Sequence, residues 1–281
     1  LDGLVNSFAR ALQAEGVQPG DKVAVCLPNI PQVIIANLAV FRVGAVTVQV
    51  NPLYTEPEMA YQINDADARL VVTLTVLIPR METIKSQTKL EKIIGCHINT
   101  FLPFPKKQLF PLVKKSMYRK VVPTENVKVF KDLIATYSSA PMEDLSQWDQ
   151  LGALLYTGGT TGVSKGVMLT HANLSCNVQQ FVAWFPDLKP GQERLVGNFP
   201  VFHVAGFTAV QNMITWQGWE DILVPRPEPA INIEIIKKYK PTFLPGVPTI
   251  FVGLLADPGF RNLDLTSIKG FFSGAAPLAA D

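Results

Sequence analysis

The sequence predicts an α/β fold built on mostly parallel sheets flanked by helices. Segments with helical spacing alternate with short apolar runs over residues 1–73 and again over 195–272. Parallel strands need long crossover connections, usually helices, so this alternation is typical of parallel sheets. The chain has 281 residues, of which 48% are hydrophobic, which is enough for one large domain or two small ones.

Glycine and proline mark many boundaries between the expected elements. Gly16 and Gly44 follow two helical segments, and Pro31 stands before one. Residues 127–150 are acidic and rich in turns, so we expect a linker there with one helix at 129–137. In the first half we expect helices at 2–15, 32–43 and 56–64, and strands at 22–27, 45–50 and 69–73.

In the second half, strands and helices alternate again around a glycine-rich loop. Residues 195–219 carry no charged side chain, but they contain asparagine, glutamine, histidine and proline. That polar content favours a buried strand and a buried helix over a membrane span. We expect strands at 151–156, 167–169, 195–199, 221–224, 242–245 and 268–272, and helices at 172–184, 207–217, 231–239 and 249–255.

Charge and cysteine content restrict the class of protein. The formal net charge is only +2, which gives no support to nucleic-acid binding. The cysteines, Cys26, Cys96 and Cys176, lie in or beside apolar runs and match no metal-binding spacing. We therefore expect reduced, buried thiols in a cytoplasmic protein that has no nucleic-acid partner.

The central stretch of the chain, residues 156–171, reads YTGGTTGVSKGVMLTH. Its glycines allow backbone N–H groups to turn toward one point, and concave nests of this kind bind anions. The threonine hydroxyls add donors, and Lys165 adds a mobile positive charge. Because apolar runs flank the stretch on both sides, we expect a loop between two strands that binds a polyphosphate.

Two other interpretations of this loop fit less well. A Walker-type loop would need a glycine before its lysine and a serine or threonine after it, whereas Lys165 stands between Ser164 and Gly166. A plain hairpin without a ligand needs only one or two glycines, whereas this stretch has four, interleaved with hydroxyl side chains.

Three further motifs follow expected strands. His203 lies in PVFHVAG; a lone histidine among apolar residues is commonly a core residue, but its place after a strand and beside Gly206 favours a site. FLPGVP, at 243–248, is either a simple turn or a place where Gly246 lets a substrate chain come close. SGAAPL, at 273–278, has small residues that leave room for a flat ring.

Residues 157–165 resemble the AMP-binding signature of adenylate-forming enzymes, a superfamily that includes acyl-CoA synthetases, adenylation domains of nonribosomal peptide synthetases and firefly luciferase. Residues 200–206 resemble that family's P-x-F/Y-H-x-x-G motif, and 274–278 resemble its G-G-A-P-L segment. Motif order and spacing match the family over essentially the whole chain. The resemblance implies a layered α/β fold with lobes of roughly 1–150 and 151–281, between which the chain can cross.

The resemblance also implies roles for individual residues. Lys165 and His203 would be catalytic, with His203 beside the carboxylate and the α-phosphate. Some long-chain relatives have a tunnel-gating tryptophan where this chain has Phe207, so a strict long-chain preference is not implied. The acyl pocket would be lined by Phe202, His203, Val204, Phe207, Gly246 and Val247. The nucleotide would be held by Thr157, Gly158, Gly159, Thr160, Thr161, Gly162, Lys165, Gly274, Ala275, Ala276 and Pro277, with Thr160 also at Mg²⁺.

The implied reaction joins a medium- or long-chain fatty acid to CoA and consumes ATP with Mg²⁺. The carboxylate attacks the α-phosphate, giving acyl-adenylate and pyrophosphate, and the thiol of CoA then displaces AMP. Two alternatives stay open: an adenylation domain that loads an amino acid or other carboxylic acid onto a carrier, and a non-catalytic nucleotide- or lipid-binding module. An amino-acid site would need an acid just after the histidine motif, and 201–209 contains none.

The family's later motifs are not found before residue 281. We therefore interpret the chain as an incomplete N-terminal AMP-binding domain without the family's C-terminal domain and its catalytic lysine. We expect it to fold but not to turn over alone. A homodimer is kept as a hypothesis.

Residues 101–120 form a basic and aromatic insert, and no acid lies between Glu91 and Glu125. Such a segment is suited to peripheral contact with an anionic membrane surface. The alternative is a solvated connector whose apolar residues pack on the domain. The segment also resembles the extended insert of long-chain acyl-CoA synthetases.

Overall fold

The computed structural model describes residues 1–158 and 164–278. The chain packs into two compact units, Leu1–Asn173 and Leu174–Asp281, each considered by itself below. The division falls within helix α7 (His171–Ala183), beyond residue 150, because the strands that follow residue 150 pair with the first sheet. Within the described residues, no helix is both long enough and apolar enough to cross a membrane.

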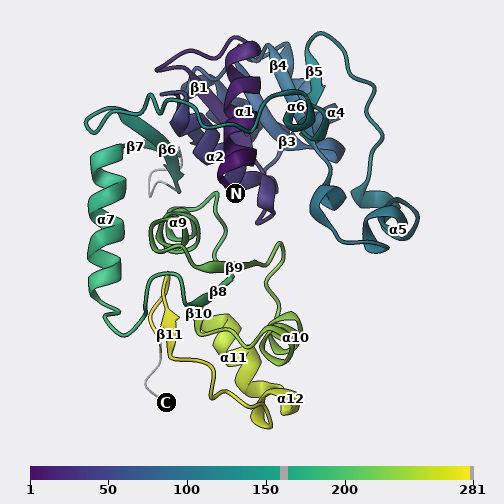
Figure 1. Ribbon diagram of the computed structural model, residues 1–281. Coiled ribbons are helices and arrows are strands. Elements are labelled where there is room, and N and C mark those ends of the chain that lie inside the picture. The colour runs from purple at the N-terminus through teal and green to yellow at the C-terminus, as the bar shows by residue number, and fades with distance from the viewer. Residues whose placement is uncertain (159–163, 279–281) are drawn as a thin grey trace. The chain divides into compact units, whose positions relative to one another are not determined.

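The first unit is built on a seven-stranded sheet with the order β5-β4-β3-β1-β2-β6-β7 (Figure 1). All neighbouring strands are parallel except β6 and β7, which form an antiparallel hairpin. The parallel sheet predicted for this half is therefore confirmed. The strands are β1 (Lys22–Cys26), β2 (Val46–Gln49), β3 (Leu70–Leu74), β4 (Lys92–Cys96), β5 (Val127–Val129), β6 (Leu151–Thr157) and β7 (Lys165–Thr170).

Helices and short 3₁₀ turns connect these strands. The helices are α1 (Asp2–Ala14), α2 (Pro31–Arg42), α3 (Glu56–Asp65), α4 (Ile78–Lys85), α5 (Lys106–Val113) and α6 (Phe130–Thr136), and the turns are η1 (Thr75–Leu77), η2 (Ile98–Phe101) and η3 (Lys115–Met117). The predicted helices near α1, α2, α3 and α6 are confirmed to within a few residues. Helix α3 begins with a capping box, in which Glu58 accepts hydrogen bonds from the backbone and hydroxyl of Thr55.

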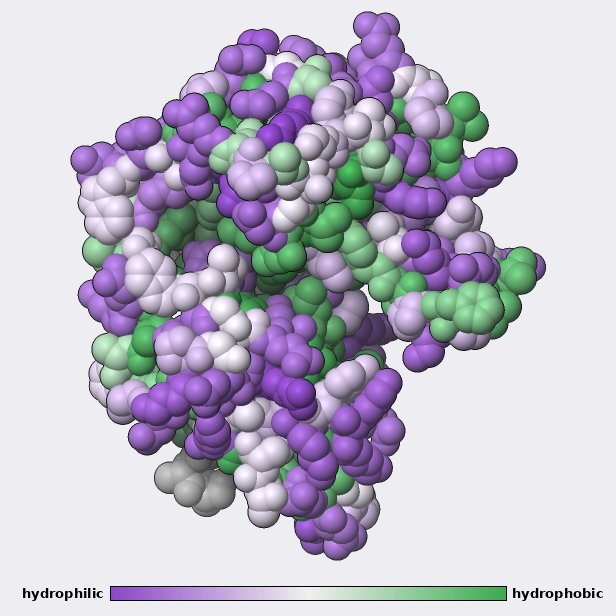
Figure 2. Space-filling view, in the orientation of Figure 1, coloured by the Kyte–Doolittle hydropathy of each residue, from purple (hydrophilic) through white to green (hydrophobic). Residues whose placement is uncertain are grey.

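Helix α5 differs from the other helices of this unit because none of its residues is buried. Figure 1 shows it standing apart from the sheet, and in Figure 2 apolar and polar side chains lie side by side at that edge of the view. Leu109, Leu112 and Val113 on α5 are exposed, whereas Phe110 is half-buried.

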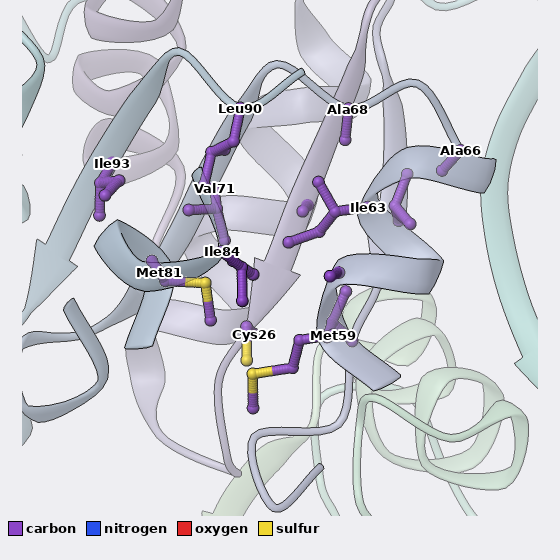
Figure 3. Packing of buried hydrophobic residues seen from close by; sticks show 14 of the residues in the cluster. Cys26, Met59, Ile63, Ala66, Ala68, Val71, Met81, Ile84, Leu90 and Ile93 are labelled. Atoms are coloured by element: carbon purple, nitrogen blue, oxygen red, sulfur yellow. The ribbon is translucent and has the colours of Figure 1, made fainter. Parts of the chain in front are cut away.

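The core of the first unit lies on both faces of its sheet. On one face, Met59 and Ile63 of α3 and Met81 of α4 pack against Cys26 and Val71, as Figure 3 shows. On the other face, α1 and α6 meet through Phe8 and Phe130, with ring centroids 4.6 Å apart, and α2 contacts Thr47 through Asn37. Because both faces are covered, β1, β2 and β3 are buried along almost their whole length, including the polar Thr47, Gln49 and Thr73.

The second unit is built on a four-stranded parallel sheet with the order β11-β10-β8-β9. Its core joins Val196, Ile236 and Leu244. The strands are β8 (Arg194–Gly197), β9 (Glu220–Leu223), β10 (Phe243–Gly246) and β11 (Gly270–Ser273), and the helices after α7 are α8 (Val204–Gly206), α9 (Met213–Gln217), α10 (Pro229–Tyr239), α11 (Pro248–Ala256) and α12 (Pro258–Arg261).

Two expectations need correction. The single helix predicted at 207–217 begins earlier, as the short turn α8, and continues through a π-helical segment, η4 (Phe207–Asn212), before α9 ends at the left-handed Gly218. Cys26 and Cys96 are buried as expected, but Cys176 is exposed, because α7 turns that side chain away from the core.

Candidate active site

The glycine-rich stretch lies in the hairpin between β6 and β7. Thr157 at the end of β6 pairs with Lys165 at the start of β7, and the Ser164 hydroxyl donates a 2.8 Å hydrogen bond to the carbonyl of Thr157. The predicted loop between two strands is therefore confirmed. Since β6 is parallel to β2, the loop leaves the carboxyl edge of the sheet, where ligands of α/β proteins commonly bind.

The described residues of this loop are open to solvent. Thr157, Gly158 and Lys165 are all exposed, and a Cβ added to Gly158 would have nothing within 4 Å. Their exposure leaves the Lys165 side chain accessible to an anion. The other predicted nucleotide-binding residues of the loop lie outside the described residues: Gly159, Thr160, Thr161 and Gly162.

Helix α3 holds both strands of the hairpin. The Tyr61 hydroxyl donates a 2.9 Å hydrogen bond to the carbonyl of Ser164, and the Tyr156 hydroxyl donates a 2.7 Å bond to the Asp65 carboxylate. The two tyrosine rings meet edge to face, with centroids 6.5 Å apart. Burial and the nearby carboxylate raise the pKa of Tyr156 far above its ordinary value, so its hydroxyl remains a donor.

This support for the loop was not predicted from the sequence. Tyr61 and Asp65 are four residues apart on one helix, so they share a face, but nothing in the sequence joins that face to Tyr156. Gly166, which was counted only as part of the loop, makes room for the Tyr156 ring: its added Cβ would lie 3.1 Å from that ring.

In the second unit, the three predicted motifs follow the carboxyl ends of three strands of one sheet. His203 follows β8, Val247 follows β10, and Gly274 follows β11. Because β8, β10 and β11 are parallel neighbours, these segments emerge on the same edge. The backbone N–H of Gly274 donates a 3.2 Å hydrogen bond to the carbonyl of Gly246, which joins two of them directly.

His203 is exposed, and a hydrogen bond from a neighbouring backbone N–H orients its ring. Its Nδ1 accepts a hydrogen bond of 3.3 Å from the backbone N–H of Ala205. A neutral imidazole whose Nδ1 is an acceptor carries its proton on Nε2. His203 can therefore present an N–H donor to a carboxylate or phosphoryl oxygen, and it is not a core histidine.

Gly206 makes the tight turn around His203 possible. A Cβ added at Gly206 would lie 2.0 Å from the carbonyl oxygen of Pro200, a contact that no packed structure tolerates. The turn is closed by hydrogen bonds from the His203 N–H to Pro200 and from the Phe207 N–H to the carbonyl of His203. Glycine is therefore required here for space.

An apolar pocket of about 240 Å³ opens at this edge of the second unit. It brings together Val204 of the histidine motif with Gly274 and Ala275 of the small-residue motif. Phenylalanine rings form much of the remaining wall, and Phe272 contacts both Phe181 and Phe199 edge to face. An apolar, aromatic wall suits hydrocarbon or a flat ring. Other residues that line it are Asn177, Ala205, Thr208 and Ala209.

The other predicted pocket residues lie elsewhere in the same unit. Phe207 is fully buried, and Phe202 is half-buried in the turn before His203. Val247 packs on the cluster of Ile233, Ile250 and Leu254, and a Cβ at Gly246 would meet the Phe251 ring at 3.3 Å. Ala276 and Pro277 follow Ala275 and are exposed.

Asn198 at this edge was not predicted from the sequence, and Ala275, which was expected at the nucleotide, has a backbone conformation that was not predicted. Asn198 is buried, and its side-chain amide donates to Pro245 and Asn232, so it ties the ends of β8 and β10 together. Ala275 has a φ of +69°, a left-handed conformation that costs a non-glycine residue about 1 kcal/mol. A polar residue at the end of an apolar strand was the available signal for Asn198.

The donor set for Mg²⁺ is not defined by the described residues. Thr160, the residue expected at the metal, lies outside them. Across residues 1–158 and 164–278, no group of three or more His, Cys, Asp or Glu is placed to hold a metal ion.

Comparison with known proteins agrees with these features. The chain is 41% identical over 277 residues to a long-chain-fatty-acid–CoA ligase of Bacillus subtilis (strain 168), covering 98% of this chain and 50% of that protein. The structure resembles a long-chain-fatty-acid–CoA ligase from Archaeoglobus fulgidus, with a TM-score of 0.81, 28% identity, and coverage of 99% of this chain and 50% of that one. It also resembles ATP-bound MatB from Rhodopseudomonas palustris, with a TM-score of 0.79, 26% identity, and coverage of 99% of this chain and 49% of that one.

The chain thus spans about half the length of the curated relatives it matches. The family model described as AMP-binding enzyme matches residues 1–281. The fold, the hairpin loop and the motif positions all agree with that match. The chain therefore belongs to the AMP-binding enzyme family.

Proposed function

We propose that the whole protein activates a medium- or long-chain fatty acid, first as an acyl-adenylate and then as an acyl-CoA thioester. One observation carries this proposal: the flank of His203 and the Gly274–Ala275 segment line a single apolar pocket at the carboxyl edge of one sheet. That arrangement suits a ligand with a flat or hydrocarbon part beside a reacting polar group. The names of the B. subtilis and A. fulgidus relatives support the same substrate class.

Each unit supplies part of the chemistry in this proposal. In the first unit, exposed donors of Thr157 and Gly158 and the Lys165 ammonium oppose negative charge on the phosphates of ATP. In the second, the Nε2–H of His203 donates to the carboxylate as it is brought against the α-phosphate. The carboxylate oxygen forms the new bond to phosphorus, and pyrophosphate leaves with the electron pair of the broken bond.

The remaining participants enter with the substrates. We propose ATP as its Mg²⁺ complex, CoA as the second acceptor, and a cytoplasmic location for the protein. Peripheral contact of residues 101–120 with an anionic membrane, and assembly as a homodimer, remain further proposals. The exposed α5 supports the first of these.

An adenylation domain for amino acids is the nearest alternative. It would need a carboxylate to hold the α-ammonium group, and the described residues that line the pocket include no acid. A non-catalytic nucleotide- or lipid-binding module would explain the pocket but gives no role to the donor nitrogen of His203.

The test is pyrophosphate release by the full-length protein with carboxylic acids of graded chain length and with amino acids. We expect release with medium- or long-chain fatty acids that requires ATP and precedes CoA addition. Release with amino acids alone would favour the carrier-loading alternative. Binding of ATP without release with any acid would favour the binding module.

A further inference from the structure

The segment between β4 and β5 carries exposed apolar side chains that no part of its own unit covers. Phe104 is 82% exposed, Leu112 is 67% exposed and Val113 is 70% exposed. Burying such side chains is favourable, so exposed apolar side chains gathered on one short segment favour an interaction surface. Figure 2 shows apolar and polar side chains side by side at the edge of the view where α5 lies.

A pocket of about 210 Å³ lies at the base of the same segment, at the carboxyl end of β4. Three lysines from different parts of the chain line it: Lys107 on α5, Lys120 after η3, and Lys131 on α6. Asp132 lines it as well, so three lysines and one acid are among its lining residues. Within residues 1–158 and 164–278, none of these lysines takes part in an ion pair.

Hydrogen bonds hold the floor of this pocket in place. The His97 ring donates from Nε2 to the carbonyl of Arg119 at 3.0 Å and stacks on Tyr118, with centroids 5.0 Å apart. The His97 carbonyl accepts from the side chains of Gln32 (2.8 Å) and Thr100 (2.7 Å). The pocket is therefore built from the sheet edge and the segment together, and is not a chance gathering of surface lysines.

We propose that this pocket binds the phosphate of an anionic phospholipid while Phe104, Leu112 and Val113 enter the acyl layer of the membrane. The charge of the segment fits an anionic surface, since no acid lies between Glu91 and Glu125. A soluble phosphate would match the lysines but would leave the apolar side chains in water. Lipid satisfies both parts at once, and this inference does not rest on the adenylation chemistry.

The experiment uses the full-length protein and two kinds of vesicle, phosphatidylcholine alone and equal parts of phosphatidylcholine and phosphatidylglycerol. We expect sedimentation with the anionic vesicles only, weakened by salt. Each lysine near an anionic surface changes the partition coefficient about fivefold, so Lys107→Gln/Lys120→Gln/Lys131→Gln should lower it about a hundredfold. The matched variant Lys189→Gln/Lys237→Gln/Lys238→Gln has the same net charge and should bind almost as the wild type does.

Two more variants separate the parts of the proposal. Lys107→Arg/Lys120→Arg/Lys131→Arg keeps the charge and should keep vesicle binding, which also checks that the pocket tolerates substitution. Leu112→Ser/Val113→Ser should lower binding without changing its salt dependence. Fatty-acid-dependent pyrophosphate release in detergent should be unchanged in all of them, so that loss of binding is not confused with loss of the reaction.

Equal losses in the pocket and control triple variants would overturn the proposal, because binding would then follow net charge alone. The proposal would also be overturned if inorganic phosphate bound through the three lysines but the pocket triple variant still bound vesicles as the wild type does. Failure of the wild type to sediment with anionic vesicles at low salt would overturn it outright.

Discussion

At the scale of single residues, the glycine-rich loop between β6 and β7 is held by side chains that belong to none of the family's motifs. The Tyr61 hydroxyl on α3 donates to the carbonyl of Ser164, which precedes β7. The Tyr156 hydroxyl at the end of β6 donates to Asp65, which is also on α3. These contacts fix the two ends of the loop while leaving Thr157 and Lys165 exposed. We therefore expect Tyr61 and Tyr156 to act as positioning residues for the loop.

Replacing Tyr61 by Phe removes the hydroxyl that donates to Ser164 and keeps the ring. A neutral hydrogen bond contributes about 1 kcal/mol, so we expect about a fivefold rise in the KM for ATP with a smaller change in kcat. The measurement is fatty-acid-dependent pyrophosphate release by the full-length protein. Tyr239→Phe, at an exposed position on α10, serves as the control. An unchanged KM would show that the loop does not depend on this bond.

Asp221 on β9 offers a test by pH. Both oxygens of its carboxyl are buried and have no hydrogen-bond partner among the described residues, and burial raises its pKa well above 3.8. A raised folded pKa means that this group's stabilising effect is complete below its unfolded pKa and is lost as pH rises through the folded pKa.

We therefore expect Asp221→Asn to leave stability nearly unchanged near pH 4 and to raise the free energy of unfolding at pH 8, on the order of 1–3 kcal/mol. Urea unfolding at several pH values measures this. Exposed Asp187→Asn should change stability by less than about 0.5 kcal/mol at either pH. A gain for Asp221→Asn that is the same at all pH values would contradict the assignment.

At the scale of elements, local patterns predicted most of the helices and strands, and packing decided the rest. Helices with clear caps and strands of continuous apolar residues were found close to their expected places, α3 and β1 among them. β5 was missed because its three residues form a strand only by pairing with β4. The π-helical segment after β8 was also missed, since its turn depends on the close approach of Gly206 to Pro200 rather than on residue pattern.

The same limit applies to the candidate site. Motif residues could be predicted from type and spacing, because glycines, hydroxyls and one lysine already indicate an anion site. Their supports could not, because Asn198 acts on β10 across 47 residues and Tyr61 acts on Ser164 across 103. Neither contact leaves a periodic signal in the sequence.

Replacing Gly206 by Ala tests the turn as an element. The added methyl would overlap the carbonyl of Pro200, so the turn that carries His203 must move. We expect a loss of about 2–3 kcal/mol in the free energy of unfolding, together with loss of fatty-acid-dependent pyrophosphate release. Thermal unfolding and the release assay measure the two effects. Full stability and activity in this variant would show that the turn does not have the described geometry.

At the scale of the whole molecule, each unit presents its functional segments at the carboxyl edge of a parallel sheet. This is where an α/β fold gathers loops from neighbouring strands, so residues far apart in sequence meet there. In the first unit the loop after β6 presents donors and a lysine; in the second, three strand ends meet around an apolar pocket. The proposed reaction needs both kinds of feature, donors for phosphate and an apolar pocket for the acyl chain.

The most direct test of this account is fatty-acid-dependent exchange of pyrophosphate into ATP by the full-length protein carrying Lys165→Ala, with exposed Lys237→Ala as the control. Losing a charge that opposes the transition state costs about a hundredfold or more, so we expect that drop for Lys165→Ala and none for Lys237→Ala. Exchange by Lys165→Ala within about twofold of the wild type would contradict the proposed role of the loop in acyl-adenylate formation.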